Sequence, residues 1–195
     1  MRITLEVVRK VLRCGLGHQC FTAAFITEVL EDPHHSSASI TQEGVLRYSP
    51  TFVEGHFTCP EDLFCLLLHE LLHPLWAHFI HSSGKLQNVA ADAVINAAIT
   101  TLYADPSGEG HLFRSFYQPQ GLEGLLRPDS QMEGDLLERV YHRLYPPPLA
   151  HPSHDSSSGA YPLTTGELIR TLKILLDEEE VGQIRLLGSH REGAP

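Results

Sequence analysis

The segment Leu66-Leu67-Leu68-His69-Glu70-Leu71-Leu72-His73 is the most informative part of this 195-residue chain. Each residue turns an α-helix by about 100°, so His69 and His73 lie only about 40° apart around the helix axis. Both imidazoles can therefore reach one metal ion, and Glu70 can reach a water molecule beside that ion. Burying these three groups among leucines costs several kcal/mol unless they are paired or hold a metal. The segment thus predicts a buried metal site.

The flanking residues place this segment on a central helix. Thr58-Cys-Pro-Glu61 has the form of a capping box with Pro in the first turn, so we expect a helix to begin there. The apolar positions that follow are Leu63, Phe64, Leu66–Leu68, Leu71, Leu72, Leu75, Trp76, Phe79 and Ile80. They leave almost no polar face, which is typical of a helix covered on every side.

A catalytic zinc site usually has three protein ligands and a fourth position for water, so a third ligand is needed. His78 is one candidate, but on a continuous helix it would lie about 140° from His73. It can bind the same ion only if the helix breaks between the two residues, and Pro74 is the residue that could kink it there. No glycine at this point allows the sharp turn that metzincins have.

Asp92 is the preferred third ligand. It follows a helix break at Ser82-Ser-Gly84 and lies within a second helical stretch, Asn88–Ile99. Asn88, Asp92 and Asn96 recur every four residues and form one polar stripe, opposite a face of Ala, Val and Ile. The stripe is therefore expected to face a polar site while the helix packs closely on its neighbours.

The spacing H-E-x-x-H is the arrangement of zinc-dependent peptidases. A carboxylate on a following antiparallel helix resembles the gluzincin layout, with Asp in place of Glu as in aspzincins. Leu68–His78 followed by Gln87–Asn96 resembles the metallopeptidase domain of bacterial von Willebrand factor A-like proteins, in which an H-E-x-x-H-x-x-x-x-H helix precedes an N-x-A-A-D-x-x-x-N helix. The resemblance extends weakly through Gly44–Phe52 and downstream to about Leu144. It implies a zincin-like domain, and the chain is expected to be too short for the von Willebrand-type domain that usually follows.

The function expected first is that of a zinc-dependent metallopeptidase. His69, His73 and Asp92 would bind Zn²⁺, and Glu70 would be the general base for an attacking water. The two asparagines of the stripe and backbone carbonyls are candidate acceptors for the outer N–H groups of the imidazoles. The alternative is a non-catalytic zincin-like binding or scaffold module with a structural or absent metal. Coordination separates the two, because catalytic sites keep an open position and structural sites are closed.

Composition narrows the partners and the location. The chain is 42% hydrophobic and 19% charged, as in ordinary globular domains. A net charge of −10 argues against nucleic acid and anionic membranes and favours a peptide or protein substrate with basic segments. No apolar run of membrane-spanning length is free of His, Glu and Pro, and the N-terminus lacks a signal-peptide core, so we expect a cytoplasmic protein. We expect Cys14, Cys20, Cys59 and Cys65 to be reduced and mostly buried.

The remaining pattern predicts a mostly helical α+β fold. Ser39–Thr41 and Val45–Tyr48 flank Gln-Glu-Gly44, which predicts a short β-hairpin whose edge could pair with an extended substrate. Further helices are expected at Ile3–Arg13, Phe21–Leu30, Leu136–Leu144 and after a capping box at Thr164-x-x-Glu167. The aromatic-rich stretch His111–Tyr117 is either a cleft wall or core, and its His111 and Tyr117 are candidates for stabilising an oxyanion.

Residues 1–145 are expected to form the zincin-like metallopeptidase domain. Residues 146–160 are rich in Pro, Ser and His and are expected to be a flexible linker. Residues 161–195 would then form a C-terminal helix and tail. Asp177–Glu180 is expected to end that helix, and Ile184–Leu187 to be a strand or a frayed tail. The tail could dock on the domain, bind a regulatory protein partner, or cover the cleft.

Overall fold

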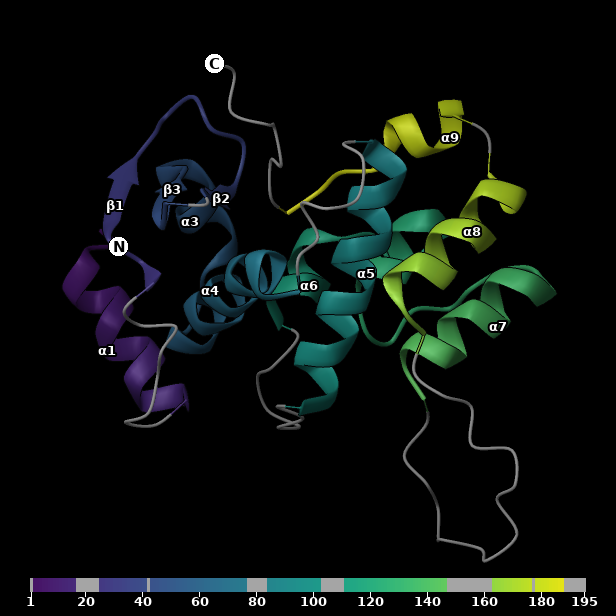
Figure 1. The fold of residues 1–195 in the computed structure, drawn as a ribbon, viewed down its shortest axis with the longest axis horizontal. Helices are drawn as coiled ribbons and strands as arrows, with labels where there is room; N and C mark the ends of the chain where they lie inside the picture. The colour runs from purple at the N-terminus through teal and green to yellow at the C-terminus, as the bar shows by residue number, and fades with distance from the viewer. Residues whose placement is uncertain are drawn as a thin grey trace, which may run out of the picture.

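Helix α4 (Pro60–Leu75) carries the His69–His73 segment and runs through the middle of the molecule (Figure 1). The computed structural model describes residues 2–16, 25–41, 43–76, 84–102, 111–146, 163–176 and 178–187. Within these ranges α1 (Leu5–Leu16) packs on one side of α4, and α5 (Lys85–Leu102) packs on another. Every residue of α4 from Asp62 to Leu71 is buried, as predicted for a helix covered on all sides.

Both ends of α4 differ from the expectation. The N-cap is Cys59 rather than Thr58, and the carboxylate that reaches back is that of Asp62 rather than Glu61. Asp62 Oδ2 accepts hydrogen bonds from the backbone N–H of Thr58 at 2.7 Å and of Cys59 at 3.1 Å. At the other end the helix includes Pro74 and stops at Leu75, where the backbone of Trp76 leaves the helical region while its N–H still donates to the Leu72 carbonyl at 2.9 Å.

Helix α5 is longer than the expected Asn88–Ile99 and packs closely on its neighbours. Its small residues Ala90 and Ala93 are fully buried, so other backbones can approach it. Helix α8 (Thr165–Leu175) packs against α5 (Figure 1). The capping box predicted for α8 is confirmed, since the backbone N–H of Glu167 donates to Thr164 Oγ1 and the backbone N–H of Thr164 donates to Glu167 Oε2.

The described residues form one mixed sheet with the order β1-β3-β2, made of β1 (Glu28–Glu31), β2 (Ala38–Ile40) and β3 (Val45–Tyr48). The antiparallel pairing of β2 with β3 confirms the predicted hairpin. Gly44 has a φ of +81°, and a Cβ atom there would lie 1.9 Å from the carbonyl oxygen of Phe25, so only glycine fits this turn. The helix expected at Phe21–Leu30 was wrong for its last part, because residues 28–31 pair in parallel with β3; residues 21–24 lie outside the described ranges.

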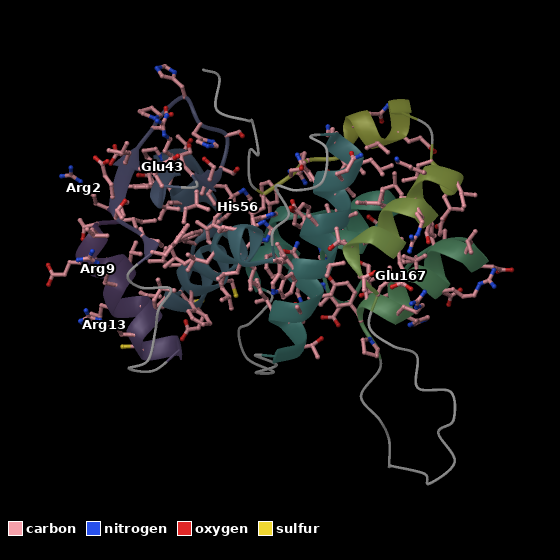
Figure 2. The ribbon with its side chains drawn as sticks, in the orientation of Figure 1. Arg2, Arg9, Arg13, Glu43, His56 and Glu167 are labelled. Carbon is pink, nitrogen blue, oxygen red and sulfur yellow. The ribbon has the colours of Figure 1, made fainter. Side chains whose placement is uncertain are left out.

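The other described elements are α3 (Pro50–His56), α6 (His111–Phe116), the 3₁₀-helix η2 (Gly121–Leu126), α7 (Asp135–Leu144) and α9 (Glu178–Gln183). Helix α7 agrees with the prediction, whereas α9 corrects the expectation that Asp177–Glu180 only ends a helix. Buried apolar residues from Ile3 to Leu187 form one cluster. Arg9 and Arg13 project from α1 on the side away from that cluster (Figure 2). In the described ranges, no helix combines the length and the apolar character that a membrane crossing requires.

Candidate metal centre

Three side chains from two helices meet at one point. His69 Nε2 and His73 Nε2 are 3.3 Å apart, and Asp92 Oδ1 lies 3.3 Å from His73 Nε2 and 3.8 Å from His69 Nε2. Ligand atoms about 2.0–2.1 Å from a tetrahedral zinc ion lie about 3.3–3.4 Å from one another. Two of the three separations match this edge length, and the third is about 0.4 Å longer. Two imidazole nitrogens and one carboxylate oxygen are also a usual ligand set for zinc.

Helix geometry explains why these groups meet. His69 and His73 are one turn apart on α4, and Asp92 faces them from α5, which packs against α4. His69 and Asp92 are fully buried and His73 is 2% exposed. A carboxylate buried this deeply costs several kcal/mol unless positive charge compensates it. A divalent cation between the three ligand atoms would supply that charge, so the residues present fit a metal ion.

The orientation of His69 is fixed by Asn96. Asn96 Nδ2 donates to the carbonyl oxygen of Leu126 at 2.8 Å, which leaves its Oδ1 as an acceptor, 2.7 Å from His69 Nδ1. His69 Nδ1 must therefore carry the proton in this contact. In the neutral imidazole Nε2 then has no proton and turns its lone pair toward His73 and Asp92. Asn96 thus selects the tautomer that a metal ligand needs.

Glu70 is 1% exposed and lies on α4 with His69 and His73, but it is not part of the cluster of three ligand atoms. This placement suits a base rather than a ligand, because a carboxylate bound to the ion could not accept a proton from water as readily. The alternative ligand His78 lies outside the described residues. Among those described, the only group of His, Cys, Asp and Glu side chains with metal-ligand spacing is His69, His73 and Asp92.

Tyr117 lies beside the cluster, at the end of α6. It is 2% exposed, and its hydroxyl accepts a hydrogen bond from the backbone N–H of Leu187 at 2.9 Å. Burial, reinforced by the negative charge of Asp92 and opposed by the hydrogen bond from the Leu187 backbone, raises the pKa of Tyr117 well above its usual value. The phenol is therefore a neutral hydrogen-bonding group. His111 is the first residue of α6, and its side chain lies outside the described part of the structure.

Two contributors to the site were not predicted. The Leu126 carbonyl belongs to η2, and Leu187 belongs to the chain end, 70 residues beyond its partner Tyr117. Neither has a local pattern that would reveal it. Strand β2 forms an edge of the sheet and packs against α4, but whether that edge pairs with a substrate stays a prediction.

Comparisons of the chain with protein-family models, with curated proteins and with solved structures found no match. The resemblance to the metallopeptidase domain of bacterial von Willebrand factor A-like proteins therefore stays a prediction from the motifs. The site is defined by the positions of its own side chains.

Proposed function

We propose that this chain is a zinc-dependent metallopeptidase with a zincin-like site. The observation that carries the proposal is the convergence of two Nε2 atoms of α4 and one carboxylate oxygen of α5 within 3.8 Å of one another, at residues that are at most 2% exposed. The H-E-x-x-H spacing and the motif resemblance add support. When bound, zinc would supply Lewis acidity, lowering the pKa of a water and polarising a carbonyl group.

The residues of the site divide into three roles. His69, His73 and Asp92 would hold the ion, the imidazoles as neutral ligands and Asp92 as the anionic one. Glu70 would accept the proton of the attacking water and pass it to the leaving amine. Asn96 would keep His69 in the tautomer that presents Nε2.

The decisive experiment compares Glu70→Gln with His73→Ala. Glu70→Gln keeps the metal ligands but removes the base, so we expect zinc content near the wild-type level and turnover lower by about 10²–10⁴-fold. His73→Ala removes a ligand, so both zinc and turnover should be lost. Zinc is measured by elemental analysis and turnover with a library of quenched fluorogenic peptides.

The matched control is Glu54→Gln, the same change at an exposed position on α3, which should alter neither zinc content nor turnover. Turnover by a pure Glu70→Gln preparation at the wild-type rate would refute the assigned base. A zinc-loaded wild-type protein that cleaves no peptide of the library would contradict the peptidase proposal.

The second candidate function is a non-catalytic scaffold with a structural metal. The deep burial of the three ligands favours it, because a structural zinc site needs no open coordination position for water or substrate. X-ray absorption of the zinc-loaded protein separates the two. Three protein ligands and a water indicate the hydrolase, whereas four protein ligands indicate the scaffold.

A further inference from the structure

The residues that follow α9, Ile184–Leu187, are here named the C-terminal segment. They form neither a strand nor a frayed tail, which corrects the expectation from sequence. Ile184 is 5% exposed and Leu187 is fully buried, so the C-terminal segment is docked on the molecule. Figure 1 shows the chain passing from α9 back toward the centre of the molecule, past the end of α5.

Arg185 anchors the C-terminal segment. Its Nε and backbone N–H donate to Glu123 Oε1 at 3.1 and 3.2 Å, and its Nη2 donates to Glu123 Oε2 at 3.0 Å. The same Nη2 donates to the carbonyl oxygen of Phe116 at 2.7 Å, and the guanidinium lies 5.2 Å from the centre of the Phe116 ring. A planar guanidinium is the group best suited to such a forked contact. The anchor therefore fixes the backbone on either side of it.

Leu187 connects this anchor to the metal centre. Its backbone N–H donates to the Tyr117 hydroxyl, and Tyr117 lies close enough to Asn96 for the Asn96 side chain to influence the pKa of the phenol. Asn96 in turn holds His69 Nδ1 at 2.7 Å. The C-terminal segment is thus three contacts away from a metal ligand, and each contact involves a buried group.

We propose that docking of the C-terminal segment and metal binding at His69, His73 and Asp92 are coupled, with Tyr117 as the positioning residue between them. This inference rests on the metal site of the proposed function but not on its peptidase activity. The docked segment holds Tyr117, which limits the positions open to Asn96 and so keeps His69 oriented. Because coupling between two equilibria is reciprocal, metal binding must also tighten the docking of the segment.

The test measures zinc affinity by competition with a chromophoric chelator, using full-length variants. Arg185→Glu places a negative charge against Glu123 and should release the C-terminal segment, lowering zinc affinity by about 5- to 30-fold. The matched control is Arg143→Glu, which breaks an exposed ion pair of 3.7 Å between α7 and Glu167 of α8 and should leave the affinity unchanged.

A second measurement identifies Tyr117 as the connection. Tyr117→Phe removes only the hydroxyl, so zinc affinity should fall, and adding Arg185→Glu to this variant should lower it no further. A purely structural role for Tyr117 would give additive losses. In the wild type, zinc should slow hydrogen exchange at the Leu187 amide, and Arg185→Glu should make that exchange fast.

Equal zinc affinity in the wild type and Arg185→Glu, together with fast exchange at Leu187 in the variant, would overturn the coupling. Additive losses in the double variant would exclude Tyr117 as the positioning residue. Failure of the proposed function is a separate result, since a protein that binds zinc and shows the coupling but cleaves no peptide contradicts only the peptidase assignment.

Discussion

Replacing Asn96 by Leu keeps the approximate volume of the side chain and removes both of its hydrogen-bonding groups. The structure identifies what is lost. His69 Nδ1 loses its acceptor at 2.7 Å, and the carbonyl oxygen of Leu126 loses its donor at 2.8 Å. Each buried group left without a partner costs about 1–3 kcal/mol, so the metal-free protein should lose about 2–6 kcal/mol of unfolding free energy. His69 would also no longer be held as the Nδ1–H tautomer, so zinc affinity should fall by about 10- to 100-fold.

Two further variants separate these effects. Asn96→Asp keeps the acceptor for His69 but loses the donor to Leu126, so stability should fall while zinc affinity is retained. Asn88→Leu is the matched control, because Asn88 is partly exposed two turns earlier on the same helix and, unlike Asn96, is not hydrogen-bonded to His69 or His73 among the described residues. Urea unfolding of the metal-free proteins and chelator competition measure the two quantities. If Asn96→Leu binds zinc as tightly as the wild type, or Asn88→Leu loses as much affinity, then Asn96 does not orient His69.

Three more outcomes are expected. Zinc at about 1,000 times its Kd should stabilise the protein by about 4 kcal/mol, which for a chain of this size raises the Tm by about 8–16 °C, and His73→Ala should abolish this rise in a thermal scan. Burial lowers the pKa of His56 from 6.5, and the nearby positive charge of Arg185 lowers it further, so Arg185→Ala should raise that pKa toward 6.5 in an NMR titration. Because the folded-state pKa is lowered, the stability that His56 contributes is complete above pH 6.5 and decreases as the pH falls below that value. An unchanged His56 pKa in Arg185→Ala would contradict the effect of the Arg185 charge. Asp62→Ala removes the acceptor of two backbone N–H groups at the start of α4 and should lower the unfolding free energy by about 1–3 kcal/mol in urea.

The meeting of His69, His73 and Asp92 was expected because it depends mostly on helix periodicity. Residues four apart share a face, and the small residues of Asn88–Ile99 indicated a helix that packs closely. Other local signals were equally direct, such as the glycine turn of the hairpin and the capping box of α8. Helix α3 has such a signal too, since Ser49 caps its first turn and Pro50 follows, although no helix was predicted there.

The features that could not be predicted from the sequence depend on contacts between residues far apart along the chain. Two capping registers one residue apart were available at the start of α4, and burial of Asp62 selects the second. Strand β1 has no alternating pattern of buried and exposed residues, because three of its four residues are exposed. Its partner in the sheet is β3, although β2 lies between the two strands along the chain. The C-terminal segment is held by an ion pair between Arg185 and Glu123, 62 residues apart, which no periodicity predicts.

The deep burial of the three ligands has a kinetic consequence. A chelator is much larger than a water molecule and cannot reach an ion held by side chains that are at most 2% exposed, so exchange requires a local opening of the packed helices. At high chelator concentration, every local opening lets the chelator capture the ion, so the rate of metal loss should become independent of chelator concentration. That plateau rate would report the opening rate of the α4–α5 contact.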